Sequence, residues 1–394
     1  MKKMLMLASV ASMIDQFNMS NIDILKKQGY EVHIAANFGY GNTSSKQRVD
    51  EFKKELKELN VPFYHVDFSR KITNILSNIK AYKQIKNLML KNKYKFVHCH
   101  SPIGGVCGRI AGHSTSTPVI YTAHGFYFFK VAPLKNWLLS YPVERYLARW
   151  TDVLITINKE DYARAKKSFK AGRVKYIPGV GLDTRKFSEV VVDRLAKRRE
   201  LKVPEEAIVL LSVGELNRNK NHEVIIRAIS NLNKSNIYYI ICGQGPLENH
   251  LRTLSKKLGL EKYVKLLGYR KDLAEVYKSA DIFAFPSRRE GLGLAALEAM
   301  ASGLPIVTSN VHGIVDYSVD GVTGYTCSPT DISGFVRAIE RLSNNDDLKI
   351  KMGQHNTGIV KNFDIENVRA KMIKIYGVML SNEREKSKHY CTSL

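Results

Sequence analysis

The chain has few cysteines and no long apolar run. Its 394 residues include five cysteines, at positions 99, 107, 242, 327 and 391, and no two of them stand at CxxC spacing. Scattered single cysteines exclude the common zinc and dithiol motifs and are typical of a reducing compartment. No stretch reaches the ~18 apolar residues that a membrane-spanning helix needs. We therefore expect a protein of the reducing cytoplasm that does not cross the membrane.

Acidic residues are scarce relative to basic ones. Lys and Arg total 61 against 37 Asp and Glu, so the formal net charge is +24 at pH 7. A field of this sign attracts nucleic acid, anionic lipid or phosphorylated small molecules. Aromatic-basic RNA motifs and a basic recognition helix are both missing, so nucleic acid is not an expected partner.

Length and composition predict two packed domains. A chain of 394 residues exceeds the usual ~100–200 residues of one domain, and 44% hydrophobic residues is ordinary for a globular protein. Short apolar runs alternate with helix-period segments, which is typical of βα units that feed a parallel sheet. A charged stretch followed by Pro204 places the domain boundary near 185–205. The predicted strands are 4–8, 32–36, 96–98, 119–122, 153–157 and 174–177, then 208–213, 237–242, 264–267, 282–285 and 306–308.

The first residues, Met1 to Met13, allow two interpretations. A basic start followed by small and apolar residues resembles a short signal peptide. The same run leads into a helix-period segment and then a second predicted strand after Gly29, which favours a buried first strand.

The strongest motif is E-G-L-G-L-A-A-L-E, which runs from Glu290 to Glu298 directly after a predicted strand. Gly291 and Gly293 let the backbone approach a ligand, and a helix that begins around Leu292–Leu294 would direct free N–H groups at a phosphate. Eight helical residues span roughly 12 Å, more than the ~5–9.5 Å between the carboxyl groups of glycosidases. The two carboxylates therefore fit better as two contacts to an elongated ligand. The alternative is a helix cap at Glu290 and a solvated Glu298.

Glycines and cations follow other predicted strands of the second half. Gly214 precedes Arg218 and Lys220 in a polar loop, and cations at the carboxyl end of a strand suit a diphosphate. A solvated basic loop is the alternative. Two more strand ends carry glycine turns, which are weak evidence alone because turns use glycine freely. Together the strand ends predict a nucleotide-diphosphate site. These turns contain Gly243, Gly245 and Pro246, then Gly268, Tyr269 and Arg270.

Taken in order, these motifs resemble glycosyltransferase family 4. The second half carries the basic loop with Lys220, the GxGP turn, and above all E-G-x-G-x-x-x-x-E, followed by E-A-M-A-S-G-L-P and G-V-T-G. In the first half, the segments Y-T-A-H-G and T-D-V-L-I-T-I-N are similar to the branch that builds exopolysaccharide or capsule repeat units on a lipid carrier.

The resemblance implies a GT-B fold, in which two Rossmann-like, doubly wound parallel-sheet α/β domains face each other across a cleft. It also implies sugar transfer, with retention of configuration, from a nucleotide-sugar, expected to be a UDP-linked hexose or N-acetylhexosamine. Residues 1–190 would bind the acceptor and 191–362 the nucleotide-sugar. A helix over 363–382 would return to the first domain, and 383–394 would form a flexible tail.

The resemblance assigns roles to matching residues. Glu290 would hold hydroxyls of the donor sugar, Lys220 would neutralise the diphosphate, and His124 would lie over the donor sugar; these three would be catalytic. Glu298 would hold the ribose. Many members have Arg where this chain has Glu215, so Arg218 would supply that charge. The other substrate-binding residues would be Gly214, Gly243, Gly245, Pro246, Gly291 and Ala295, with Gly293 and Leu294 at the distal phosphate and Tyr269, Arg270 and Leu273 at the base.

The expected partners follow from the same resemblance. They are a UDP-sugar donor, a polyprenyl-diphosphate-linked saccharide acceptor, and the anionic inner face of the cell membrane. No D-x-D triplet suited to a metal beside a nucleotide-sugar is present in the sequence, and we expect no metal and no cofactor. The alternative is a nucleotide-sugar epimerase of the same fold, which is disfavoured because its site does not normally use the paired glutamates.

Three further features have open interpretations. The segment 126–150 combines clustered aromatic and basic residues, which is typical either of a surface that inserts into an anionic membrane or of a core helix with a solvated basic face. His98 and His100 stand at i, i+2 without further ligands at metal spacing, which favours a place in the cleft lining. Arg70, Lys71 and Arg109 are candidate contacts for an acceptor phosphate.

Overall fold

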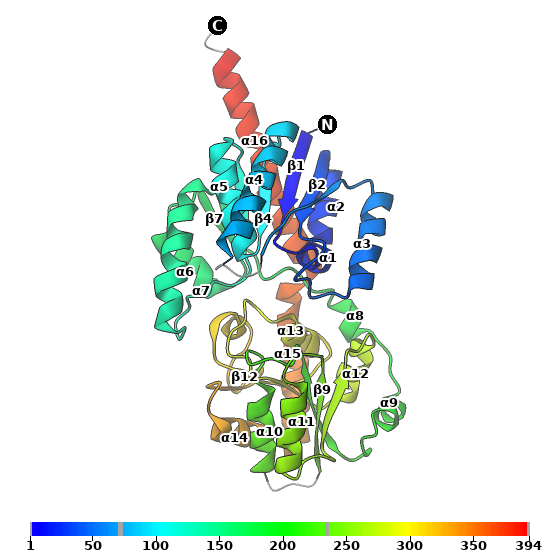
Figure 1. The fold of residues 1–394 in the computed structure, drawn as a ribbon. Coiled ribbons are helices and arrows are strands. Elements are labelled where there is room, and N and C mark those ends of the chain that lie inside the picture. The colour runs from blue at the N-terminus through cyan, green and yellow to red at the C-terminus, as the bar shows by residue number, and fades with distance from the viewer. Residues whose placement is uncertain (1, 70–73, 233–235, 392–394) are drawn as a thin grey trace. The chain divides into compact units, whose positions relative to one another are not determined.

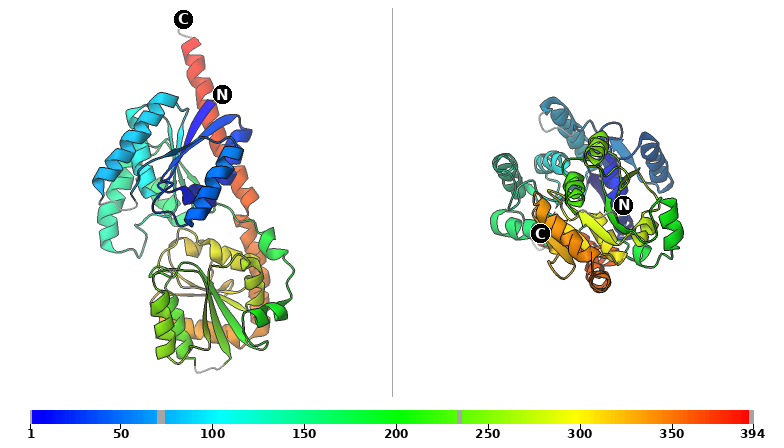
Figure 2. Two further views of the ribbon diagram at one scale, coloured as in Figure 1. Left: turned by 45° about the vertical axis from the view of Figure 1, so that its right-hand side comes forward. Right: turned by 90° about the horizontal axis from the view of Figure 1, so that it is seen from below.

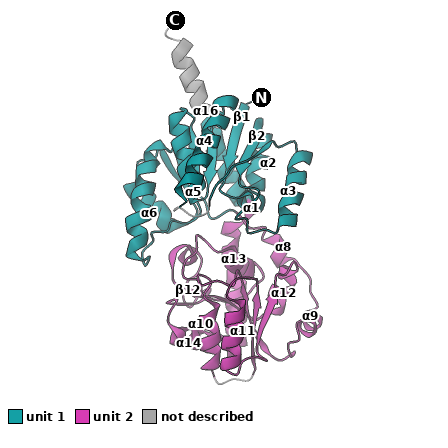
Figure 3. Ribbon diagram, viewed as in Figure 1, with its two compact units in different colours: residues 1–180, 366–394 teal, residues 181–365 magenta. Residues whose placement is uncertain are grey.

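The computed structural model describes residues 2–69, 74–232 and 236–391, with side chains up to residue 379. The chain divides into two compact units, residues 1–180 with 366–394 (unit 1) and residues 181–365 (unit 2), as Figure 3 shows. Each unit contains one parallel sheet with helices on both faces (Figures 1 and 2). The predicted pair of doubly wound α/β domains is confirmed.

The sheet of unit 1 has the strand order β3-β2-β1-β4-β5-β6-β7, and every neighbouring pair is parallel. Strand β1 lies between β2 and β4, and its residues from Met4 to Leu7 have no exposed surface. The structure therefore agrees with the strand interpretation of the first residues. The strands are β1 Lys2–Leu7, β2 Tyr30–Ala36, β3 Phe63–His65, β4 Val97–His100, β5 Val119–Ala123, β6 Val153–Thr156 and β7 Arg173–Tyr176.

The last helix of the chain, α16, belongs to unit 1. Its Arg369 donates to Asp23 at 2.7 Å, and its Tyr376 hydroxyl is 2.8 Å from His98 Nδ1. The helix continues to Cys391, through residues predicted to be a tail. The helices of unit 1 are α1 Ala11–Phe17, α2 Met19–Lys27, α3 Lys46–Glu58, α4 Ile75–Asn92, α5 Pro102–Ser114, α6 Leu134–Leu147, η1 Ala148–Trp150, α7 Lys159–Ser168 and α16 Ile365–Cys391.

The sheet of unit 2 has the order β10-β9-β8-β11-β12-β13 and is parallel throughout. Its strands are β8 Ile208–Val213, β9 Ile237–Cys242, β10 Val264–Gly268, β11 Ile282–Phe285, β12 Ile306–Ser309 and β13 Gly324–Cys327. Its helices are α8 Arg185–Ser188, α9 Arg194–Glu200, α10 His222–Ser230, α11 Glu248–Lys257, α12 Leu273–Ser279, α13 Leu294–Ala301, η2 His312–Asp316, α14 Ile332–Ser343, α15 Asp346–Ile359 and η3 Val360–Phe363.

Unit 1 ends at Val180, earlier than the predicted boundary at 190, because α8 and α9 pack on α12 and α13 of the second sheet. Two strands were not predicted. Strands β3 and β13 lie at sheet edges, have three and four residues, and are only partly buried. Edge strands of this kind need no continuous apolar run, so the hydrophobic pattern does not reveal them.

Each unit has its own apolar core. Of the two interpretations of segment 126–150, the core interpretation fits three of its aromatics, because Phe126, Phe128 and Phe129 are buried in unit 1. Cys99, Cys107, Cys242 and Cys327 are free and buried. None of the helices in the described part of the chain is long and apolar enough to cross a membrane.

Candidate active site

Strands β8 and β11 of unit 2 are neighbours although they are not consecutive, so the strand order reverses between them. In open parallel sheets, ligands bind beyond the carboxyl ends of the strands at such a point. The register brings the predicted strand ends to one edge, because Val213 pairs with Cys242 and Cys242 with Gly268. The loops after β8 and β11, which carry the two strongest motifs, meet at this edge.

Lys220 and Glu290 join the two loops. Lys220 Nζ donates to Glu290 Oε1 at 2.7 Å, and both side chains are largely buried. The ammonium also lies 4.8 Å from the centre of the Phe285 ring, on the side where a cation is attracted by the ring face. The Lys220 backbone N–H donates to Asn217 at 2.9 Å. The cation and the carboxylate therefore have fixed places at the reversal of the sheet.

Asparagines hold the same two loops together through the backbone. Asn219 Nδ2 donates to the Arg289 carbonyl at 2.9 Å, and the Arg288 N–H donates to the Asn219 carbonyl at 2.8 Å. Asn221 Nδ2 donates to the Pro286 carbonyl at 3.0 Å. Sequence reasoning missed these positioning residues; their alternate spacing in N-R-N-K-N, typical of turns, is the only signal.

Helix α13 begins at Leu294, as the motif predicts, and its N-cap is Gly293 with a φ of +96°. A Cβ at Gly293 would come within 2.6 Å of the Phe285 ring, so both the backbone conformation and the space require glycine. The first-turn N–H groups of a helix lack intrahelical partners and carry its positive end. The start of α13, with the N–H groups of its first turn, therefore lies in the same loop as Glu290.

Glu298 is partly buried and lies against Tyr277 of α12. The Tyr277 hydroxyl donates to Glu298 Oε2 at 2.9 Å and to the Ala295 carbonyl at 3.0 Å. Burial raises the pKa of Glu298, while the bond from Tyr277 and the charges of Lys186 and Lys220 lower it. Glu298 is therefore not the solvated helix residue of the alternative interpretation. The sequence offered no sign of Tyr277.

Tyr317 is a second residue that the sequence did not reveal. Its hydroxyl is buried and makes no hydrogen bond within the described residues. The position that a Cβ would take at Gly293 is 3.0 Å from this hydroxyl, which places Tyr317 beside the start of α13. A phenol there can donate to a ligand bound at the Gly293 turn.

The glycines of the GxGP turn pack against protein backbone. A Cβ at Gly243 would lie 1.9 Å from the Gly214 carbonyl, and one at Gly245 would lie 2.6 Å from the Leu216 carbonyl. The loop after β8 and the loop after β9 can approach this closely only with glycine. Close packing alone accounts for both glycines, and Pro246 is exposed beside them.

The residues predicted to line the base pocket differ in their surroundings. Tyr269 is 72% exposed, whereas Arg270 donates to Asp272 at 2.8 Å and to Glu200 at 2.6 Å. These bonds raise the pKa of Arg270 above its usual range and lower that of Asp272 to about 2. Leu273 begins α12 and is partly buried. Arg270 is thus already paired with acids.

Arg218 is exposed and forms no ion pair with the side chains that the structure describes, and Glu215 is also exposed. The charge of Arg218 is therefore free for a ligand. The side chain lies in the same short loop as Lys220, between β8 and α10.

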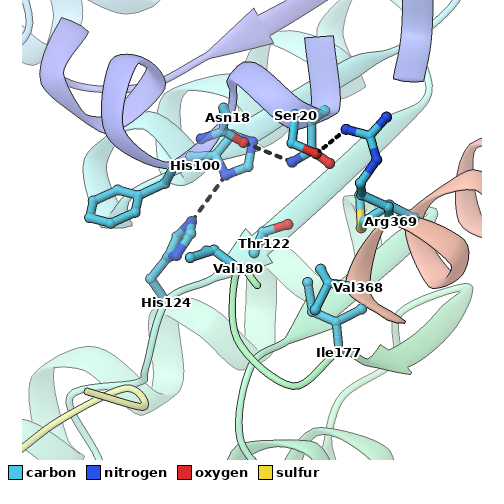
Figure 4. A pocket seen from close by; sticks show the side chains of 12 residues that line it. Asn18, Ser20, His100, Thr122, His124, Ile177, Val180, Val368 and Arg369 are labelled. Atoms are coloured by element: carbon cyan, nitrogen blue, oxygen red, sulfur yellow. Dashed lines mark hydrogen bonds between the residues drawn. The ribbon is translucent and has the colours of Figure 1, made fainter. Parts of the chain in front are cut away.

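The third predicted catalytic residue, His124, lies in unit 1 at the end of β5. His100 Nδ1 is 3.0 Å from His124 Nε2, and both rings line a cavity of about 20 Å³ with Asn18, Thr122 and Arg369 (Figure 4). Burial lowers the pKa of His124 to about 4 and that of His100 well below its usual value. The two imidazoles are therefore neutral near pH 7, one donating to the other.

His98, another candidate of unit 1, is hydrogen-bonded within the protein core. His98 is buried between Thr122 and Tyr376, at 2.8 Å from each hydroxyl. In the described ranges no group of three or more His, Cys, Asp or Glu side chains could hold a metal.

The interpretation of Arg109 as a phosphate contact is wrong. The side chain is 1% exposed, donates to Glu144 at 2.8 Å and lies over the Tyr121 ring, so its charge is already neutralised in the core. Arg70 and Lys71 lie outside the described residues.

Comparisons with known proteins agree with this architecture. Residues 22–184 match the model of Glycosyltransferase Family 4, and residues 193–357 match that of Glycosyl transferases group 1. A protein of Bacillus subtilis (strain 168), named as a glycosyltransferase, EpsD, is 35% identical over 98% of this chain and 99% of its own length.

Two further relatives are informative. The Escherichia coli UDP-Gal:alpha-D-GlcNAc-diphosphoundecaprenol alpha-1,3-galactosyltransferase is 29% identical over 79% of this chain and 82% of its own. The crystal structure of Anabaena Alr3699/HepE in complex with UDP has a TM-score of 0.76 at 19% identity and covers 96% of this chain and all of that one, which shows a shared fold. The chain belongs to glycosyltransferase family 4.

Proposed function

We propose that this protein is a retaining glycosyltransferase of surface-polysaccharide synthesis. It moves a sugar, a hexose or N-acetylhexosamine, from a UDP-sugar to a saccharide on a polyprenyl diphosphate at the inner face of the membrane. The observation that carries the proposal is the Lys220–Glu290 pair beside the start of α13, where the strand order of unit 2 reverses.

Each part of that arrangement suits one part of the donor. The diphosphate, an anion, would accept hydrogen bonds from the ammonium of Lys220 and from the free N–H groups at Leu294 and Ala295. Lys220 would then exchange its carboxylate partner for the phosphate, and Glu290 would become an acceptor for hydroxyls of the donor sugar. Glu298, held by Tyr277, would accept from the ribose.

Charge development explains how these groups would accelerate transfer. When the bond between the anomeric carbon and the phosphate oxygen breaks, its electron pair leaves with UDP and positive charge grows on the carbon. A preorganised cation and helix end beneath the diphosphate stabilise that leaving group more in the transition state than in the ground state. The acceptor oxygen forms the new bond from the same face, and its proton passes to the departing phosphate oxygen, so configuration is retained.

The relatives support the choice of substrates. One of them has a name that specifies a UDP-sugar donor and a diphosphoundecaprenol acceptor, and the structure of another contains UDP. Both compounds fit a basic protein, because each carries a diphosphate.

Thermal shift with a panel of nucleotide-sugars tests the donor. Specific ligands stabilise the folded protein by mass action, so one donor should raise the melting temperature more than the others. No shift with any nucleotide or nucleotide-sugar would overturn the proposed function. Incubating the stabilising donor without acceptor tests the epimerase alternative: an unchanged sugar is the expected result, and its epimer would contradict transfer.

Metal dependence is tested in the same assay. We expect transfer to continue in excess EDTA, because Lys220 and the α13 amides can supply the positive charge that a metal provides elsewhere. Complete loss of activity in EDTA with recovery in Mn²⁺ would show that the enzyme needs a metal.

A further inference from the structure

The side chain of Tyr317 is buried directly after η2. The residue is 1% exposed, and its ring stands nearly at a right angle to the ring of Phe363, with 6.0 Å between the two ring centres. Its hydroxyl is buried and makes no hydrogen bond to any group in the described part of the chain. A buried donor without a partner costs free energy, and native proteins keep few of them. Packing alone therefore does not account for a tyrosine at this position.

The backbone holds the segment of Tyr317 against the loop that carries Glu290. The N–H of Gly313, in η2, donates to the Glu290 carbonyl at 3.1 Å. A Cβ at Gly313 would lie 1.9 Å from the Gly291 carbonyl, so a side chain would not fit there. Further along the same segment, the Tyr317 hydroxyl is 3.0 Å from the position that a Cβ would take at Gly293. The hydroxyl thus lies beside the few residues that join Glu290 to the start of α13.

The proton of Tyr317 and the charge of Glu290 are complementary. Burial raises the pKa of Tyr317 well above its usual range, and the charges of Glu290 and Asp316 raise it further, so the phenol keeps its proton. Among the side chains that the structure describes, Lys220 is the only hydrogen-bond partner of the Glu290 carboxylate. A carboxylate has about four acceptor positions. Glu290 can therefore accept from a phenol as well as from an ammonium.

We propose that Tyr317 is a positioning residue that replaces Lys220 as the partner of Glu290 when a nucleoside diphosphate binds. The phenol donates to the carboxylate as the ammonium turns to the diphosphate, so Glu290 stays charged and in place for the donor sugar. Without a new donor, the largely buried carboxylate would lose its compensation, which is costly. The step with the diphosphate rests on the proposed function. The pairing itself does not, because removal of Lys220 should produce it in the protein without ligand.

A double-mutant cycle of Lys220→Met and Tyr317→Phe tests the pairing without ligand. With Lys220 present, Tyr317→Phe removes a hydroxyl that has no partner in the described ranges, so the unfolding equilibrium constant of unit 2 should stay within about twofold or fall. In Lys220→Met, where the hydroxyl is expected to hold Glu290, the same change should raise that constant about tenfold or more.

Urea unfolding of the full chain, followed by circular dichroism, compares the four proteins of this cycle. Tryptophan fluorescence reports on unit 1 alone, because Trp137 and Trp150 both lie there, and so identifies the transition that belongs to unit 2. The matched control is Tyr263→Phe, a partly buried tyrosine just before the amino end of β10. Its effect should be the same with and without Lys220.

A second cycle, of Tyr317→Phe and Glu290→Gln, tests the exchange of partners with UDP. In the protein with Glu290, Tyr317→Phe should raise the Kd for UDP about tenfold in calorimetry, because UDP must then leave the carboxylate unpaired. In Glu290→Gln no charge is left behind, so the same change should alter the Kd by less than about threefold. Every variant of this cycle keeps Lys220, so the test holds even if Lys220→Met does not fold.

Three results would overturn the inference. Equal effects of Tyr317→Phe on unfolding with and without Lys220 would show that the hydroxyl does not pair with Glu290. A loss of UDP affinity that persists in Glu290→Gln would mean that the hydroxyl contacts the ligand itself, and no loss in either background would mean that it has no part in binding. If UDP does not bind to any variant, the proposed function fails, and the cycle without ligand still decides whether Tyr317 holds Glu290.

Discussion

Lys220 Nζ donates to Glu290 Oε1 across 2.7 Å, and this contact links the loop after β8 to the loop after β11. Both side chains are largely buried, so the loss of either partner leaves the other charge uncompensated. The two residues are 70 positions apart in sequence. In the proposed function, their meeting would bring together a cation for phosphate and an acceptor for hydroxyls.

Replacing Lys220 should weaken nucleotide binding. Lys220→Met removes a charge-assisted contact to the diphosphate, and we expect the Kd for UDP to rise about 10- to 100-fold in calorimetry. Lys351→Met, at an exposed position of α15, is the matched control and should bind UDP normally. Normal UDP binding by Lys220→Met would show that Lys220 does not contact the diphosphate.

Replacing Glu290 should affect transfer more than binding. Glu290→Gln keeps the shape of the side chain but removes its negative charge. That charge would interact more strongly with the donor sugar in the transition state than in the ground state, so kcat should fall about 10²- to 10³-fold. The Kd for UDP, which lacks the sugar, should change little. An equal loss in both measurements would mean that Glu290 only anchors Lys220. Glu215→Gln, at an exposed position, is the control.

Gly293 should tolerate no side chain. Gly293→Ala forces a Cβ to within 2.6 Å of the Phe285 ring at a φ of +96°, and we expect the free energy of unfolding of unit 2 to fall by about 1–3 kcal/mol. Gly358→Ala, inside α15 with open space around it, should instead stabilise by up to about 1 kcal/mol. Urea unfolding followed by circular dichroism compares them. A neutral effect of Gly293→Ala would contradict the tight turn.

Tyr277 should be needed to hold Glu298. Tyr277→Phe deletes the hydroxyl that donates to Glu298 Oε2 at 2.9 Å, leaving a partly buried carboxylate without that partner. We expect a loss of about 1–3 kcal/mol in unfolding free energy and weaker UDP binding. Tyr40→Phe, at an exposed position of unit 1, should change neither. Unchanged UDP affinity in Tyr277→Phe would contradict a ribose contact by Glu298.

Acid should destabilise unit 1 through its buried histidines. Burial lowers the pKa of His98 to about 3 and that of His124 to about 4, from a usual value of 6.5. Below about pH 6.5 these histidines therefore become protonated in the unfolded chain but stay neutral in the folded chain. For each histidine, the free energy of unfolding falls by up to about 1.4 kcal/mol per pH unit until the pH reaches the pKa in the folded chain. The contribution of the neutral histidines to the free energy of unfolding is therefore complete above about pH 6.5 and is lost as the pH falls below that value.

Tryptophan fluorescence can follow this effect selectively, because Trp137 and Trp150, the two tryptophans of the chain, both lie in unit 1. We expect the urea midpoint to fall between about pH 7 and pH 4.5, and to fall less in His98→Gln. A midpoint that does not change with pH over this range would contradict buried neutral histidines.

Much of the fold follows from local pattern. Eleven predicted strands correspond to strands of the two sheets, because a strand buried on both faces requires a short apolar run and helices require a different period. Strands β3 and β13 were missed because they have only three and four residues and are partly buried, so neither stands out as an apolar run. The start of α13 was predicted from Gly291 and Gly293, which stand between a strand and a helix-period segment.

Contacts between distant segments could not be predicted. The neighbours of Arg109 in the sequence are mostly glycines and small residues. They do not indicate its ion pair with Glu144, which lies 35 positions later and is buried. Tyr277 and Tyr317 approach the site from segments without a motif. Tertiary packing alone decides such pairs, because side chains meet through the order of strands in a sheet.

The scarcity of acidic residues had suggested an anionic partner without saying where it binds. The sequence by itself determined the parallel α/β architecture, the start of α13 after the Glu290 motif and the family, since these depend on residues close together in the chain. Only the tertiary structure decided that Lys220 meets Glu290 and that Phe126, Phe128 and Phe129 are core. The reason is physical: a pattern specifies which residues can be buried, but the neighbouring elements determine which of them are.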